Sequence, residues 1–227
     1  MGYRERPGPV PGVVVWTRRV DASPQPNRIL PDGCLDLIWN GSTLFVAGPD
    51  TSARWHTSQP GASYVALRCA GGVGPALVGV PAHAVVDESP ELSDVWPAGA
   101  ARTLAERVAE RPAALAEWAL QRARSCQIDP VGPTVLRLAA DGAAVSSMAE
   151  RLGLSSRQLH RRCLDSFGFG PRRLIRVLRF DRALRAARAG VPFAQVAADA
   201  GYSDQAHLAR DSQNLAHTTV TSLVAGR

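Results

Sequence analysis

The chain has no lysine: all 26 of its basic residues are arginine. It also lacks any apolar run near the roughly 20 residues that a membrane-spanning helix needs. No apolar stretch follows the first residues, as a secretory signal peptide would require. These absences predict a cytoplasmic protein. The arginine bias, with abundant Ala, Gly, Pro and Val, is typical of a genome rich in G and C and is not by itself a sign of function.

Cysteine is scarce, with four in 227 residues and no CxxC pair. Thiols so far apart are predicted to stay free in a reducing compartment. The four are Cys34, Cys69, Cys126 and Cys163. Cys34 stands between Asp32 and Asp36, whose negative charges disfavour a thiolate. A nucleophilic cysteine is therefore not expected.

Motifs for catalysis and metal binding are missing too. His56 and His83 are isolated in the sequence, so the paired-histidine site of a cupin barrel is absent. There is no GxSxG motif and no phosphate-cradling loop of the P-loop kind. We therefore expect no enzyme activity, no cofactor and no metal.

Positive charge is confined to the C-terminal part of the chain. Residues 1–129 hold 12 Arg and 13 acids, a net charge of −1, whereas residues 130–227 hold 14 Arg and 7 acids, a net charge of +7. The charge is densest in residues 151–188, with 11 Arg and two Asp. Such a concentration attracts a phosphate backbone and makes binding dependent on salt.

A helix-turn-helix pattern occurs twice in this basic part, in residues 147–163 and 193–212. Each copy has a short amphipathic helix, a Gly turn and an apolar residue that fills the core. A polar N-cap, predicted at Ser155 and Ser203, then opens a second helix whose outer face is Arg, Gln and His. Such a helix suits the major groove of DNA. A long helix that starts at Pro171 is predicted to hold the two units at a fixed spacing.

Residues 131–226 resemble the DNA-binding domain of AraC/XylS-type transcriptional regulators, a pair of helix-turn-helix units joined by a linker helix. The resemblance rests on Ser155-Ser156-Arg157-Gln158-Leu159-His160-Arg161, Gly168-Phe169-Gly170-Pro171, Arg179 with Ala183, and Ala197 through Gly201-Tyr202-Ser203-Asp204-Gln205. It implies a regulator that binds double-stranded DNA through both recognition helices. It also implies which residues face the groove: Arg157, Gln158, His160, Arg161 and Arg162 on the first helix, and Gln205, His207 and Arg210, with Asp211 beside them, on the second.

Some positions depart from the family pattern. Cys163 and Ser212 stand where the family usually has Phe, and His217 and Val220 replace a common Gly and Pro. We expect smaller cores under both recognition helices, and a hydroxyl where Ser212 should be apolar. The second unit is thus predicted to bind DNA weakly or through phosphates, and Ser212→Phe is predicted to raise stability.

The N-terminal half is predicted to be rich in strands, at Val13–Trp16, Leu35–Trp39, Leu44–Val46 and Tyr64–Arg68, with a hairpin turn at Asn40-Gly41. The prediction is an α+β protein: residues 1–98 form a small β-sandwich or barrel-like domain, 99–129 a helical linker, and 130–227 an all-α domain. Residues 30–39 and 78–82 resemble an uncharacterised sensor domain found in a subset of these regulators.

A sensor role predicts an apolar pocket with a few polar groups, for a small-molecule effector. The candidates are Trp39, Arg54, Trp55, His56 and Arg68. The leading hypothesis is a transcription regulator, monomeric or homodimeric. The alternative is an interaction protein whose second unit has lost base readout and whose main task is to contact a partner such as RNA polymerase.

Overall fold

The computed structural model describes residues 2–21 and 26–226. Its N-terminal half contains a five-stranded antiparallel sheet and a two-stranded ribbon. In spatial order the main sheet is β1 Gly2–Pro7, β2 Val13–Arg19, β7 Ser63–Cys69, β4 Leu35–Trp39 and β5 Leu44–Ala47. The ribbon pairs β3 Asn27–Ile29 with β6 Arg54–His56.

One face of the main sheet is buried beneath helices. Alternate residues of the central strands, such as Leu37 and Leu67, point into this core and are at most 1% exposed. Burial of each such leucine contributes about 1.5–3 kcal/mol to folding. The covering elements are α1 Val73–Val78, η1 Ala82–Val85, α2 Leu92–Val95, α3 Ala98–Glu110 and α4 Ala114–Ser125.

The other face of the sheet carries the opposite residues of the same strands. Trp16, Ile38 and Ala66 form a small cluster there, with Phe45 and Tyr64 packed against it. Because side chains alternate along each strand, one face of the sheet forms the main core, and the opposite face carries a smaller buried cluster.

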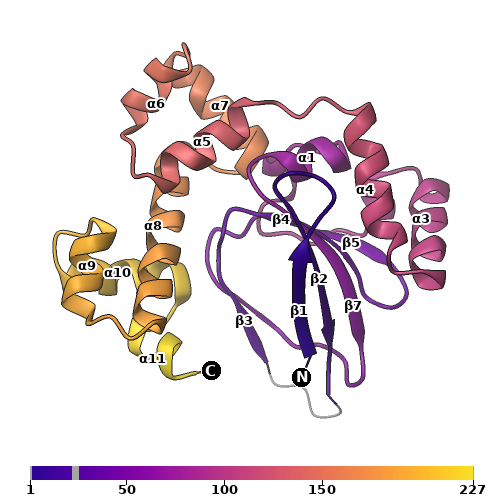
Figure 1. Cartoon of the computed structure of the whole chain (residues 1–227), viewed down its shortest axis with the longest axis horizontal. Coiled ribbons are helices and arrows are strands. Elements are labelled where there is room, and N and C mark those ends of the chain that lie inside the picture. Colours follow the sequence, from indigo (N-terminus) through magenta and orange to yellow (C-terminus); the bar gives the residue numbers. More distant parts are fainter. Residues whose placement is uncertain (1, 22–25, 227) are drawn as a thin grey trace.

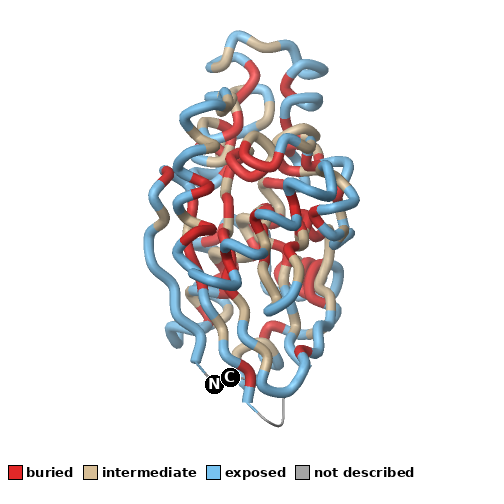
Figure 2. Tube along the Cα trace, turned by 90° about the vertical axis from the view of Figure 1, so that its right-hand side faces the viewer, coloured by how far each residue is buried: buried red, intermediate tan, exposed pale blue. Residues whose placement is uncertain are grey.

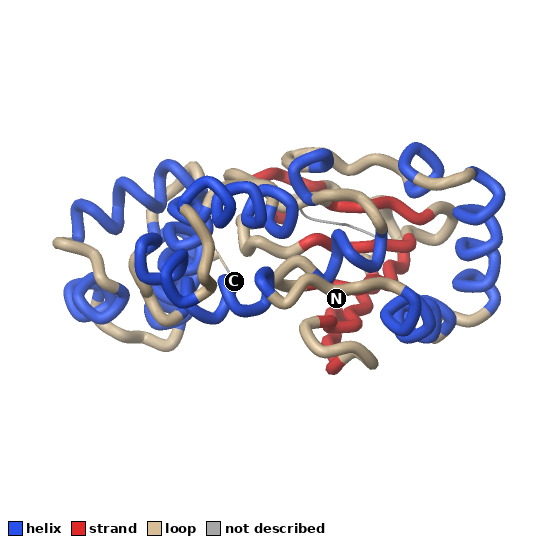
Figure 3. The backbone as a smooth tube through the Cα atoms, turned by 90° about the horizontal axis from the view of Figure 1, so that it is seen from above, coloured by secondary structure: helices blue, strands red, loops and turns tan. Residues whose placement is uncertain are grey.

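The C-terminal half is entirely helical. Its helices are α5 Val131–Ala140, α6 Val145–Arg151, α7 Ser156–Phe167, α8 Pro171–Arg188, α9 Phe193–Ala200, α10 Gln205–Ala216 and α11 Val220–Ala225. Helices α6 and α7 form the first helix-turn-helix unit, and α9 and α10 form the second. Figure 1 shows α8 running between them beside the sheet, and Figure 3 shows helices flanking the strands at both ends of the molecule.

The two halves pack against each other. The backbone N–H of Ala53 donates to the carbonyl of Leu215 in α10 (2.7 Å), and His83 Nδ1 lies 3.3 Å from an Asp165 carboxylate oxygen in α7. Figure 2 shows buried segments in the interior of the molecule and exposed segments over much of its outside. The N-terminal half touches both helix-turn-helix units, so it can influence how they sit relative to each other.

The α+β class and the all-α C-terminal half agree with the sequence prediction, as do the four predicted strands and the hairpin. Strand β1, the ribbon and the short helices α1, η1 and α2 were not predicted. The predicted linker helices α3 and α4 bury Leu104 and Trp118 in the core of the sheet. Among the described residues, no helix combines the length and apolar character needed to cross a membrane.

Candidate nucleic-acid interface and interdomain cavity

Helix α7 begins at a reciprocal side-chain cap. Ser155 Oγ accepts a hydrogen bond from the backbone N–H of Gln158 (3.2 Å), and Gln158 Oε1 accepts one from the backbone N–H of Ser155 (2.8 Å). This capping box satisfies two backbone groups near the helix start. The predicted N-cap at Ser155 is confirmed. The side chain of Gln158, predicted to face the groove, is engaged in this cap.

The outer face of α7 carries free cationic side chains. Its inner face is anchored by the buried residues Leu159, Cys163 and Phe167. Arg157, His160 and Arg161 are exposed on the opposite side. Within the described part of the chain, Arg157 and Arg161 form no ion pair. Two unpaired guanidinium groups on a capped helix are available to phosphates or to guanine edges.

Arg162 is held differently from these two arginines. Its Nη1 lies 2.5 Å from Asp129 Oδ2, in the segment that precedes α5. Both side chains are more than a third exposed, so the pair contributes little to stability. Arg162 contacts the interdomain segment in this conformation, and a DNA phosphate would compete with Asp129 for it.

Helix α10 is capped by Asp204 rather than by Ser203, which corrects the sequence prediction. Asp204 Oδ1 accepts from the backbone N–H of His207 (2.6 Å). Ser203 instead places its Oγ 3.3 Å from His207 Nδ1. A carboxylate at this position is favourable because it also meets the positive end of the helix dipole.

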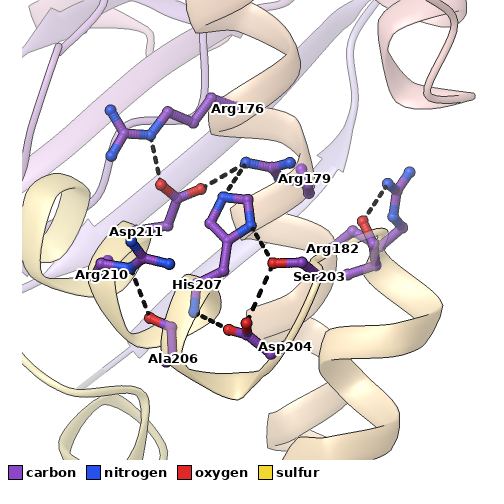
Figure 4. A network of polar contacts seen from close by, with 10 residues as sticks. Arg176, Arg179, Arg182, Ser203, Asp204, Ala206, His207, Arg210 and Asp211 are labelled. Atoms are coloured by element: carbon purple, nitrogen blue, oxygen red, sulfur yellow. Dashed lines mark hydrogen bonds and ion pairs between the residues drawn. The ribbon is translucent and has the colours of Figure 1, made fainter.

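A polar network joins α10 to α8 (Figure 4). Asp211 is 4% exposed, and its two carboxylate oxygens accept from Arg176 Nε (2.7 Å) and Arg179 Nη2 (2.9 Å). The Arg179 guanidinium also stacks 4.3 Å from the ring centre of Tyr202 and lies 3.4 Å from His207 Nε2. Two guanidinium groups offset the cost of burying one carboxylate, so this network fixes α10 on the linker helix.

The network changes what the second recognition helix presents. His207 was predicted to face the groove, but its ring is half-buried and packs edge-on against Tyr202, with centroids 5.0 Å apart. Asp211, predicted beside the groove, is buried. Gln205 and Arg210 remain exposed. The second unit therefore offers fewer free polar groups than the first.

Arg182 of α8 contacts both α5 and α9. Its guanidinium donates to the carbonyl of Ala140, at the end of α5, and to the carbonyl of Ala200, at the end of α9 (3.3 Å for the latter). Each of these carbonyl groups lies at the end of a helix, where the last carbonyls have no intrahelical hydrogen-bond partner. A single side chain thus connects α5 and the second helix-turn-helix unit to the linker helix. Nothing in the isolated sequence of α8 distinguishes Arg182 from the other arginines there.

Ser212 is fully buried, but its hydroxyl is satisfied. Its Oγ donates to the carbonyl of Thr218 (2.6 Å), so the polar group sits in a hydrogen bond and not in an apolar void. His217, which stands where the family has Gly, ends α10 in the left-handed region with φ 52°. An L-residue is strained in that region.

An interdomain cavity of about 830 Å³ lies between the open face of the main sheet, the ribbon and helix α8. Trp16, Ile38 and Tyr64 line it from the sheet, and Phe180 and Leu184 line it from α8. This volume is in the range of small-molecule sites, which are commonly found between domains.

A charged cluster occupies the sheet side of this cavity. Asp36 and Arg68 are directly opposite each other in β4 and β7, with Arg68 Nε 3.5 Å from Asp36 Oδ1. Asp32 and Glu5 lie 3.7 and 3.3 Å from the same guanidinium. Trp16 Nε1 donates to the other oxygen of Asp36 (2.9 Å). Burial raises the pKa of Asp36 to about 7, and the neighbouring charge of Asp32 adds to the rise while Arg68 opposes it.

The structure brings together most of the predicted pocket residues. Arg54, Trp55, His56 and Arg68 all line the cavity. Trp39 does not, because it stands one position beyond Ile38 in β4 and packs on the helical side of the sheet. Arg54 is paired with the buried Asp50 (2.6 Å), and the pKa of His56 is lowered by burial and by nearby arginines. The contributions of Asp36 and of α8 were missed by the sequence analysis.

Two family models match the chain. Residues 148–225 match a helix-turn-helix domain, and residues 13–91 match a domain of unknown function, DUF6597. The sequence has no significant match among curated proteins.

Solved structures similar to this chain include those of ToxT and of the C-terminal domain of AraT. The apo form of a ToxT variant from Vibrio cholerae is 11% identical, with 94% of this chain and 97% of that chain covered at a TM-score of 0.50. Unsaturated fatty acid bound ToxT is also 11% identical, with 96% of each chain covered at 0.46. The C-terminal domain of AraT, a response regulator from Geobacillus stearothermophilus, is 17% identical, with 44% of this chain and 88% of that chain covered at 0.41. The chain thus carries a helix-turn-helix domain in its C-terminal half and a domain of unknown function in its N-terminal half, and its fold is similar to that of ToxT.

Proposed function

We propose that α7 and α10 enter successive major-groove segments of duplex DNA, and that α7 supplies most of the sequence reading. The observation that carries this proposal is the pair of exposed, unpaired guanidinium groups of Arg157 and Arg161 on a capped helix. His160 is exposed beside them. The surrounding net charge of +7 in residues 130–227 supplies the attraction to phosphates.

The second unit plays the lesser part in this proposal. Gln205 and Arg210 are its exposed polar groups from the predicted set, whereas His207 and Asp211 are engaged with α8. Helix α10 therefore positions the protein on the DNA, chiefly through phosphates, and adds little base selectivity.

A small molecule in the interdomain cavity would modulate DNA binding. Helix α8 lines the cavity through Phe180 and Leu184. Through Arg179 and Arg182 the same helix contacts α10, α9 and α5. A ligand that binds one position of α8 better than another shifts the arrangement of both recognition helices.

The test is fluorescence anisotropy of the full-length protein on a fragment of its own promoter and on random DNA of equal length. Arg157→Ala should weaken promoter binding by about 1–3 kcal/mol and reduce the preference for the promoter. Arg102→Ala, an exposed arginine in α3, is the matched control and should leave both affinities unchanged.

Equal losses on promoter and random DNA would assign Arg157 to phosphate contact. Weak binding to both DNAs by the parent protein at low salt would contradict the proposal. That result would favour the alternative, a protein that chiefly contacts a partner such as RNA polymerase.

A further inference from the structure

We propose that the interdomain cavity takes an organic cation: a molecule with an aromatic or apolar body and a protonated amine directed at Asp36 and Asp32. This inference deepens the proposed function, because it gives a chemical class to the ligand that would modulate DNA binding.

The walls of the cavity suit the body of such a molecule. Trp16, Phe45 and Tyr64 contribute aromatic surface from the sheet, and Phe180 faces them from α8. Apolar walls with few polar groups are typical of small-molecule sites. Aromatic faces also attract a cation through the negative charge of their π electrons. The walls therefore accept both the body and the charged end of the ligand.

The charges on the sheet side are unbalanced. Three carboxylates, those of Glu5, Asp32 and Asp36, lie within 4 Å of the single guanidinium of Arg68. Asp36 is the least exposed of the three, with 13% of its side chain accessible, so water screens its charge poorly. Burial raises the pKa of Asp36 to about 7, and the negative charge of Asp32 adds to the rise. A bound ammonium group supplies the missing charge.

Two independent features mark the cavity as a binding site. Ser58 lines it and is 4% exposed, and its hydroxyl has no hydrogen-bond partner among the described residues. Tyr3, Ile29 and Trp55 also line it, and they are three of the four large apolar side chains exposed in the described part of the chain. Exposed apolar surface gathered at one cavity, with an unsatisfied hydroxyl beside it, indicates a ligand.

Among the described residues, Arg68 is the arginine paired with Asp36. Arg18 also lines the cavity, near His56, whose pKa its charge helps to lower. Arg54 is neutralised by Asp50 at 2.6 Å, and Arg28 stacks on Trp55, 4.5 Å from the ring centre. Arg188 is exposed to solvent, which screens its charge. Asp36, by contrast, is covered and lies among the aromatic side chains. Around Arg68, at the Asp36 end of the cavity, carboxylates therefore outnumber guanidinium groups.

The proposal is tested with three probes built on one ring system: tryptamine, 3-ethylindole and indole-3-propionate. Their binding to the full-length protein is measured by ligand-observed NMR and by isothermal titration calorimetry, up to millimolar concentration. Tryptamine should bind most tightly. Asp36→Asn should weaken the binding of tryptamine by at least about tenfold and leave the affinity for 3-ethylindole nearly unchanged, because only the ammonium group loses its partner.

Asp141→Asn, an exposed acid at the end of α5, is the matched control and should change no affinity. Phe180→Ala should weaken all three probes, since it removes a wall and not a charge. Tighter binding of indole-3-propionate, equal binding of all three, a tryptamine affinity unaffected by Asp36→Asn, or no binding of any probe would each overturn the proposal. DNA anisotropy without probes is measured on the same samples, so a failure of DNA binding is separated from a failure of the ligand site.

Discussion

The contact between Asp211 and the two arginines of α8 allows a quantitative prediction for Asp211→Ala. Removing one partner from a buried ion pair typically costs about 3–5 kcal/mol, because the other charge is left without compensation. Arg176 and Arg179 are 33% and 21% exposed, so both regain some water when the carboxylate is lost. We therefore expect the lower end of the range, about 3 kcal/mol.

The loss should be local to the second helix-turn-helix unit. Hydrogen exchange read by mass spectrometry measures this directly, because peptides from α9 and α10 report the opening of that unit alone. A loss of about 3 kcal/mol corresponds to exchange on the order of 100-fold faster in these peptides. Peptides from α6 and α7 should be unchanged. In a DNA footprint, protection should weaken under the second patch and persist under the first.

The control for this prediction is Asp181→Ala. Asp181 pairs with Arg185 on the surface of α8, and Arg185 is 71% exposed, so the pair should contribute no more than about 0.5 kcal/mol. The reasoning is refuted if exchange in α10 of the Asp211→Ala protein stays within about threefold of the parent protein, the range of an ordinary surface substitution.

Three further predictions follow from single residues. His217→Gly should raise the free energy of unfolding by about 0.5–1 kcal/mol in urea titration, because it relieves the left-handed strain at φ 52°. The control, Ala209→Gly at an exposed position within α10, should lower the free energy of unfolding. A His217→Gly protein less stable than the parent would contradict the argument. The Asp36 carboxyl ionises near pH 7 when folded and near 3.8 when unfolded, so its folded state binds the proton more tightly and stability falls as pH rises through that window. As the pH rises from about 5 to about 8, the free energy of unfolding of Asp36→Asn should therefore increase by about 2–3 kcal/mol relative to that of the parent. A difference independent of pH would show that the pKa of Asp36 is not shifted. Ser212→Phe should lower the free energy of unfolding by about 1–3 kcal/mol, because the larger side chain enters a filled core and the hydrogen bond to the Thr218 carbonyl is lost. A higher melting temperature than that of the parent would show that the site is underpacked.

The helical half was readable from the sequence because its signals are local. The capping pair Ser155 and Gln158, the start at Pro171 and the apolar spacing in α8 all act within a few residues. The one misplaced cap illustrates the limit: Ser203 and Asp204 are both good capping residues, and only the path of the backbone decides between them.

The cavity was harder to foresee because it depends on contacts between distant segments. Asp36 and Arg68 are directly opposite each other through strand register, which sequence alone does not specify. The alternation in β4 does carry a usable signal, since it places Trp39 on the opposite face from Asp36. The contribution of α8 to the same cavity follows from the packing of the two halves, for which no local pattern exists.

The length of α8 determines how the two helix-turn-helix units are placed relative to each other. The helix has 18 residues, which at about 1.5 Å per residue gives an axis of about 27 Å. Inserting one residue near its centre would rotate the second unit by about 100° around that axis and carry α10 out of phase with the groove that α7 occupies. A substitution in α8 leaves this phase unchanged, whereas an insertion or a deletion near its centre alters it. If both units bind DNA as proposed, the length of α8 sets the separation of the two contacts, and a different separation requires a helix of different length.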